Sequence, residues 1–171
     1  MPDRNKLTFI IGGGRSGKSA HAETLAKALP SPWTYIATAQ AYDGEMRERI
    51  ALHRSRRGEG WATIDAPLDL ASALEALPDN QPVLVDCLTL WLTNHMLADH
   101  DIGAECRRLA DVLSRPRGPW FVVSNEVGQG IVPDNALARR FRDDAGRLNQ
   151  QVAAIADTVL LMVAGLPLKV K

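Results

Sequence analysis

The chain has 171 residues, and its 20 lysines and arginines balance its 20 aspartates and glutamates, so its formal net charge is zero. This length suits one domain over residues 1–171, and the lack of a net field argues against nucleic-acid or anionic-membrane partners and favours small molecules or copies of the chain itself. Two cysteines without metal-ligand spacing, no secretory signal and no bilayer-spanning apolar run predict a cytoplasmic protein without membrane insertion.

The first half of the chain alternates short apolar, β-prone runs with helical patterns. Residues 7–11 read as a strand that leads through glycines into an alanine-rich helix over 19–29. The elements expected next are a strand over 33–37, a helix over 44–55, a short strand over 61–64 and a helix over 68–77. Within 44–55, Met46, Ile50 and His53 recur at spacings of four and three, which predicts one mostly apolar helix face.

The second half continues the same alternation. The elements expected are a buried strand over 83–85, helices over 88–98 and 104–114, a strand over 120–123 and a long helix over 134–156. Strands over 158–163 and 166–170, about a turn at Gly165, are expected to finish the chain. The long helix carries an apolar stripe made of Leu137, Phe141, Leu148, Val152 and Ile155. Continuous apolar strands alternating with helices predict an α/β fold with a parallel sheet covered on both faces.

The glycine-rich segment after the first strand is a phosphate-binding loop, or P-loop. Its residues are Gly12, Gly13, Gly14, Arg15, Ser16, Gly17, Lys18 and Ser19. The glycines let successive N–H groups point inward at the positive end of the next helix, where they cradle phosphate oxygens. Lys18 is expected to reach the β- and γ-phosphates, and the Ser19 hydroxyl to bind Mg²⁺. An ordinary glycine turn would not need the lysine and serine at these positions.

Acidic residues follow three of the predicted strands. Asp65, Asp86 and Glu126 are expected at the carboxyl ends of strands, and ligands of open α/β sheets lie beyond that edge. Asp86 fits a second ligand of the Mg²⁺ shell. The alternative for any one of these acids is a solvated position at the end of a strand.

His53 precedes an arginine-rich segment that includes Arg54, Arg56 and Arg57. A histidine ring nitrogen can attack phosphorus, and neighbouring guanidinium groups can hold phosphate oxygens. From this segment alone, a structural histidine beside a solvated arginine face remains the preferred interpretation.

Together these stretches resemble one known family. The matching residues are 12–19, 35–39, 53–57 with Trp61, 125–133, 141–143, 145–150 and 165–171. The chain is similar along this length to the bifunctional adenosylcobinamide kinase / adenosylcobinamide-phosphate guanylyltransferase family of cobalamin biosynthesis. The P-loop is shared by many families, whereas the segment N-E-V-G-x-G-I-V-P at 125–133 with the helix at 141–150 is specific to this one.

The resemblance implies two reactions, with adenosylcobinamide and adenosylcobinamide phosphate as substrates. The aminopropanol hydroxyl is phosphorylated first, with ATP or GTP as donor, and GMP is then transferred from GTP through a guanylylated histidine that matches His53. A RecA-like P-loop sheet, Mg²⁺ and a homotrimer are also implied. Besides the P-loop, the implied nucleotide contacts are Ile36, Ala37, Thr38, Arg54, Ser55, Arg56, Arg57, Asp65 and Asp86.

Two alternative functions stay open at this point. One is another P-loop small-molecule kinase in which His53 is structural, and the other is a module whose assembly is controlled by nucleotide and which modifies no substrate. Neither explains the 125–133 segment. The chain also lacks the N-K-x-D loop of GTPases after the P-loop, so the preference for guanine rests on the resemblance.

Overall fold

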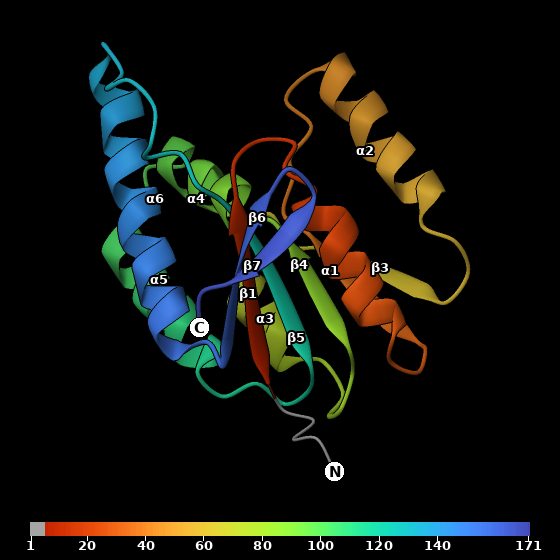
Figure 1. Cartoon of the computed structure of the whole chain (residues 1–171). Helices are drawn as coiled ribbons and strands as arrows, with labels where there is room; N and C mark the ends of the chain where they lie inside the picture. Colours follow the sequence, from red (N-terminus) through yellow and green to blue (C-terminus); the bar gives the residue numbers. More distant parts are fainter. Residues whose placement is uncertain (1–5) are drawn as a thin grey trace.

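A computed structural model describes residues 6–171 and arranges them as a seven-stranded sheet with helices on both faces (Figure 1). The strands are β1 (Leu7–Gly12), β2 (Trp33–Ala37), β3 (Trp61–Asp65), β4 (Val83–Asp86), β5 (Trp120–Asn125), β6 (Thr158–Val163) and β7 (Leu166–Lys169). The helices are α1 (Lys18–Lys27), α2 (Gly44–Arg56), α3 (Leu70–Glu75), α4 (Leu88–Leu97), α5 (Ile102–Leu113) and α6 (Ala136–Ile155). Every predicted strand and helix is present.

The strand order is β3-β2-β4-β5-β1-β6-β7, and β1 to β6 run parallel. In this register Gly12 pairs with Asn125 and with Met162, and Ala37 pairs with both Asp65 and Asp86. The loops that leave these strands therefore meet at one edge of the sheet, which is where α/β proteins bind ligands.

The core has two layers because successive residues of a strand point to opposite faces of the sheet. Phe9 and Val85 pack on the face covered by α3, α4, α5 and α6. Ile10 and Leu84 pack on the other face, beneath α1. Ala22 and Ala26 of α1 pack fully buried against this face, and α1 and α3 lie on opposite sides of the sheet in Figure 1.

Two details, in α3 and α6, differ from the sequence-based expectations. Helix α3 begins at residue 70 because the Asp69 carboxylate caps it, accepting from the Ser72 N–H at 3.2 Å. Strand β7 is antiparallel to β6, in agreement with the turn expected at Gly165, where Ala164 and Gly165 take positive φ angles of 50° and 79° and turn the chain back. Leu137 was expected on the buried stripe of α6 but is 56% exposed at the first turn of that helix.

Helix α2 is the largest departure from its predicted packing. None of its residues is buried, although its sequence predicts an apolar face, and Leu52 is 50% exposed. Its first turn is closed by Asp43, whose carboxylate accepts from the Met46 N–H at 2.7 Å. In Figure 1 the helix stands out from the sheet beyond α1, so its position depends on few apolar contacts.

The contrast between the core and α2 predicts a difference in stability between two leucine substitutions. Leu84→Ala removes a fully buried side chain under α1 and should lower the free energy of unfolding by about 2–5 kcal/mol. Leu52→Ala should change it by less than about 0.5 kcal/mol, because that side chain already contacts water. Urea titration followed by far-UV circular dichroism measures both, and equal losses would contradict this description of the core.

Candidate active site

The loop between β1 and α1 forms the predicted phosphate cradle, residues 12–19, at the carboxyl edge of the sheet. It leaves β1 at Gly12 and enters α1 at Lys18. Gly17 has a φ of 91°, a left-handed conformation that glycine adopts without strain. No side chain caps the N-terminus of α1, so its first N–H groups remain available to an anion.

Lys18 lies inside this loop. Its side chain is 7% exposed, and its ammonium group donates to the Gly13 carbonyl at 2.5 Å and to the Ser16 hydroxyl at 3.4 Å. Burial lowers the pKa of Lys18, and the nearby Cys87 and Asp86 oppose this shift. A buried ammonium group held by a neutral carbonyl is a strong partner for phosphate, whose negative charge favours the protonated form.

Ser19 and Asp86 meet beside the cradle. The Ser19 hydroxyl, in the first turn of α1, donates to Oδ2 of Asp86 at the end of β4 over 2.8 Å. A hydroxyl and one carboxylate suit Mg²⁺, which binds to few protein oxygens and completes its shell with water and phosphates. Over residues 6–171 no group of three or more acidic, histidine or cysteine residues is placed to hold a metal. A metal at the Ser19–Asp86 pair would therefore depend on the nucleotide.

The other two strand-end acids reach the same edge but do not join this pair. The Glu126 carboxylate accepts from the Gly128 N–H at 2.6 Å and so stabilises its own loop. Asp65 accepts from the Arg54 guanidinium, with contacts of 2.6 and 2.5 Å to its two oxygens. This ion pair raises the pKa of Arg54, and it ties α2 to β3. Direct nucleotide contact by Asp65 remains a prediction.

His53 is exposed on α2, and no hydrogen bond to its ring is formed within residues 6–171. Its neighbours differ in their contacts. The Arg57 guanidinium lies 3.6 Å above the centre of the Tyr35 ring and donates to the Thr63 hydroxyl at 3.3 Å, whereas the Ser55 hydroxyl donates to the Leu52 carbonyl at 2.9 Å. Arg56 is exposed. The structure thus leaves the His53 ring accessible and anchors one end of its helix through Arg54 and Arg57.

The segment Ile36, Ala37 and Thr38 lies between the cradle and α2 in the chain, but its side chains are buried. The Thr38 hydroxyl donates to the Cys87 carbonyl at 2.7 Å and accepts from the Cys87 N–H at 2.9 Å. It therefore supports the turn after Asp86. Because these side chains are buried, they do not account for the nucleotide contacts expected of this segment, and those contacts stay a prediction.

The 125–133 loop is held by α6. Arg142 donates to the Gly128 carbonyl at 2.9 Å, and Arg139 donates to the Pro133 carbonyl at 2.8 Å. Asn149 is buried. Its side-chain amide donates to the Asn125 carbonyl at 3.1 Å and accepts from the Ser124 hydroxyl of β5 at 2.7 Å. The two segments that make the sequence resemblance specific are therefore in contact with each other.

The pattern of the family described as "Cobinamide kinase / cobinamide phosphate guanyltransferase" matches residues 8–170. The chain belongs to this family. A "Bifunctional adenosylcobalamin biosynthesis protein CobP" of Pseudomonas aeruginosa is 47% identical over 166 residues, which cover 95% of this chain and 96% of that protein. A "Bifunctional adenosylcobalamin biosynthesis protein CobU" of Escherichia coli K12 is 40% identical, with 96% and 99% covered.

Solved structures of ATPases share the fold at much lower identity. An ATPase of the type III secretion system of pathogenic bacteria superposes with a TM-score of 0.58 at 13% identity, over 92% of this chain and 51% of that one. The ATPase EscN of enteropathogenic E. coli gives a TM-score of 0.56 at 12% identity, over 94% and 43%. This chain thus spans about half the length of these ATPases or less, and the likeness confirms the predicted RecA-like P-loop fold alone.

Among residues 6–171 no helix has both the length and the apolar character needed to cross a lipid bilayer.

Sequence reasoning missed Tyr35 as a site residue of this family member. Tyr35 lies in the middle of β2, and its hydroxyl donates to the same Asp86 oxygen as Ser19, also over 2.8 Å. Burial raises the pKa of Tyr35, and so does Asp86, so the hydroxyl keeps its proton and acts as a donor. The available signal in the sequence was the tyrosine hydroxyl within an otherwise buried strand. The sequence could not identify its partner, because Asp86 lies 51 residues away.

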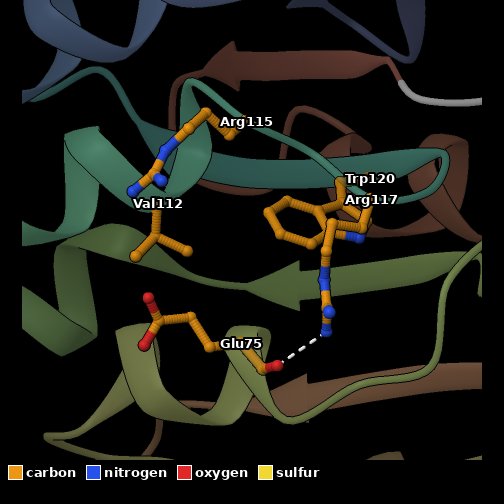
Figure 2. A pocket seen from close by; sticks show the side chains of 5 residues that line it. All are labelled: Glu75, Val112, Arg115, Arg117 and Trp120. Atoms are coloured by element: carbon orange, nitrogen blue, oxygen red, sulfur yellow. Dashed lines mark hydrogen bonds between the residues drawn. The ribbon is translucent and has the colours of Figure 1, made fainter.

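A pocket of about 350 Å³ lies away from the cradle, at the amino end of β5, and is lined by Glu75, Val112, Arg115, Arg117 and Trp120 (Figure 2). Its arginines already have partners. Arg117 donates to the Glu75 and Leu77 carbonyls, and Arg115 pairs with Asp111 at 2.6 Å. None of the predicted site residues lines this pocket.

Close packing at the base of the cradle predicts a difference between two adjacent glycines. A Cβ at Gly12 would lie 2.7 Å from the Ser16 hydroxyl and 2.8 Å from the Met162 carbonyl, whereas a Cβ at Gly13 meets nothing within 4 Å. Gly12→Ala should therefore lower the free energy of unfolding by about 1–3 kcal/mol and Gly13→Ala by less than about 0.5 kcal/mol. Urea titration without nucleotide compares them, and an equal cost would contradict this packing of the cradle.

Proposed function

We propose that this chain phosphorylates the aminopropanol hydroxyl of adenosylcobinamide and then transfers GMP from GTP to that phosphate, giving adenosyl-GDP-cobinamide. The observation that carries the proposal is the complete cradle, with Lys18 buried in it and the Ser19–Asp86 pair beside it, in a chain that belongs to the cobinamide kinase / guanyltransferase family over nearly its whole length. ATP or GTP would supply the phosphoryl group.

In the kinase step, the chain acts mainly by positioning and by charge. The N–H groups of the cradle and the Lys18 ammonium would hold the β- and γ-phosphates while the substrate hydroxyl oxygen attacks the γ-phosphorus. The new P–O bond replaces the bond to the nucleoside diphosphate, and the hydroxyl proton is released. When bound, Mg²⁺ would be held through Ser19 and Asp86 and would neutralise charge on the phosphate oxygens. The donors are fixed before the reaction, which is the condition for electrostatic stabilisation.

In the guanylyl step, His53 is the proposed nucleophile. A ring nitrogen would attack the α-phosphorus of GTP, forming a P–N bond as the bond to the β-phosphate oxygen breaks and pyrophosphate leaves. An oxygen of adenosylcobinamide phosphate would then attack the same phosphorus and displace the histidine. The exposure of His53 supports this role, because the ring must meet two different partners in turn.

The arginines near His53 have separate proposed roles. Arg56 is exposed and free to approach phosphate oxygens, whereas Arg54 and Arg57 are engaged with Asp65 and Tyr35. Arg54 would reach a nucleotide only by exchanging the Asp65 carboxylate for it. An exposed ion pair of this kind contributes about 0–1 kcal/mol, so the exchange costs little.

The single catalytic domain over residues 1–171, the cytoplasmic location and the homotrimer stay predictions. Exposed apolar side chains support self-association. Among them, Ile131 is 97% exposed and Leu166 is 71% exposed, at the 125–133 loop and at the last strand.

The His53 assignment predicts a covalent intermediate that is separable from the kinase reaction. Protein incubated with α-labelled GTP should carry an acid-labile, base-stable label, as expected for phosphohistidine-type bonds, and His53→Ala should lose it. The same variant should still transfer the γ-phosphoryl group to adenosylcobinamide. His100→Ala, another exposed histidine, serves as the control and should keep the label. A label that persists in His53→Ala would exclude His53 as the nucleophile.

The cradle assignment predicts that Lys18→Ala loses phosphoryl transfer from γ-labelled nucleotide to adenosylcobinamide by about 10²–10³-fold, the loss typical of removing one preorganised donor to developing charge. Lys27 lies on the same helix with an exposed side chain, so the control variant Lys27→Ala should keep full activity. Labelled corrinoid product separated by chromatography gives the rate. Undiminished transfer in Lys18→Ala would place the kinase site elsewhere.

A further inference from the structure

One oxygen of the Asp86 carboxylate accepts two hydroxyl donors from two different elements. Ser19 donates from α1 and Tyr35 from β2, each at 2.8 Å to Oδ2. No donor within residues 6–171 contacts Oδ1. Two donors on one oxygen fix the rotation of the carboxylate and leave the other oxygen free for water or a cation.

Tyr35 is placed to hold this orientation because strand pairing fixes its backbone. Tyr35 on β2 pairs with Leu84 on β4, two residues before Asp86, so donor and acceptor belong to neighbouring strands. Ser19, by contrast, belongs to the helix that follows the cradle and that phosphate would contact directly. Of the two donors, Tyr35 is therefore the one whose position is independent of the nucleotide.

The Tyr35 ring is itself held on more than one side. It is 6% exposed, the Trp61 ring meets it edge-on with centroids 6.1 Å apart, and the Arg57 guanidinium covers it at 3.6 Å. These contacts leave the ring little freedom, so the direction of its O–H group is set by packing. A tyrosine needed only for packing would not have to direct its hydroxyl at this acid.

We propose that Tyr35 is a positioning residue for the magnesium nucleotide: its hydroxyl orients Asp86 so that the free carboxylate oxygen faces the metal shell. The inference rests on the proposed function, which places Mg²⁺ with the triphosphate at the Ser19–Asp86 pair. Tyr35 itself touches neither substrate nor metal. Its removal should therefore affect the contribution of Mg²⁺ to binding and leave the grip of the cradle on phosphate unchanged.

The test compares Tyr35→Phe with Tyr42→Phe by equilibrium binding of the non-hydrolysable analogue β,γ-imido-GTP, once with Mg²⁺ and once with EDTA. Phenylalanine keeps the ring and its contacts with Trp61 and Arg57. Tyr42 is the other tyrosine of the chain, and its hydroxyl also makes a hydrogen bond, to Asn94 at 2.8 Å, away from Asp86.

In Tyr35→Phe, the gain in affinity caused by Mg²⁺ should fall about tenfold, because a hydrogen bond to a charged group is lost. The Kd in EDTA should stay within about twofold of wild type, as should both Kd values of Tyr42→Phe. An equal loss of affinity with Mg²⁺ and with EDTA would show that Tyr35 has only a structural role and would overturn the proposal. An unchanged gain in affinity from Mg²⁺ would also overturn it. If the wild-type protein bound no analogue at all, the proposed function itself would be wrong. If it bound the analogue but Tyr35→Phe left the Mg²⁺ gain unchanged, only the role of Tyr35 would be wrong.

A double-mutant cycle isolates the pair. Tyr35→Phe in an Asp86→Asn background should change the Kd with Mg²⁺ by less than about twofold, because the charged acceptor is already gone. A tenfold loss in that background as well would show that Tyr35 acts independently of Asp86 and would overturn the assignment.

Discussion

Parallel pairing of β1 with β5 and β6, and of β4 with β2 and β5, is the constraint on which the site depends. It brings the carboxyl ends of these strands to one edge, so that Gly12, Asp86 and Asn125 leave the sheet side by side. No single contact at the site could achieve this, because its residues are separated by tens of positions in the sequence. The hydrophobic burial of the strands fixes the geometry, and the polar groups at their ends use it.

Lys18 and Asp86 at the sheet edge are buried or partly buried, whereas His53 is exposed. Lys18 is buried with a carbonyl partner, and Asp86 has two donors, so these groups need little rearrangement to receive a phosphate. Helix α2 has no fully buried residue, and the Arg54–Asp65 ion pair and the contacts of Arg57, just after the helix, tie it to the sheet. The two proposed chemistries are therefore located on parts of the fold that differ in packing.

The sequence was sufficient for the elements and the cradle because both depend on local patterns. The spacing of Gly12 to Ser19 and the apolar strands each lie within a few residues. The strand order was not predicted, because it depends on pairing between strands that are far apart in the sequence. Two features could not be predicted from the sequence, because they depend on contacts between distant residues or on the absence of a packing partner. The bond from Tyr35 to Asp86 requires the β2–β4 register, and the apolar side of α2 finds no core to pack against.

The exposure of His53 has a chemical reason within the proposed reaction. A nucleophile buried beside the cradle would meet GTP readily, but the phosphorylated corrinoid must then reach the same phosphorus from outside. A ring on an exposed helix allows both encounters, while the charge on the triphosphate is balanced by groups that stay fixed in the cradle. The Arg57–Tyr35 contact joins these two regions, since the guanidinium just after α2 covers the ring whose hydroxyl holds Asp86. The position of His53 is therefore linked to the Asp86 side of the site through this stacked pair, in addition to the Arg54–Asp65 ion pair that ties α2 to β3.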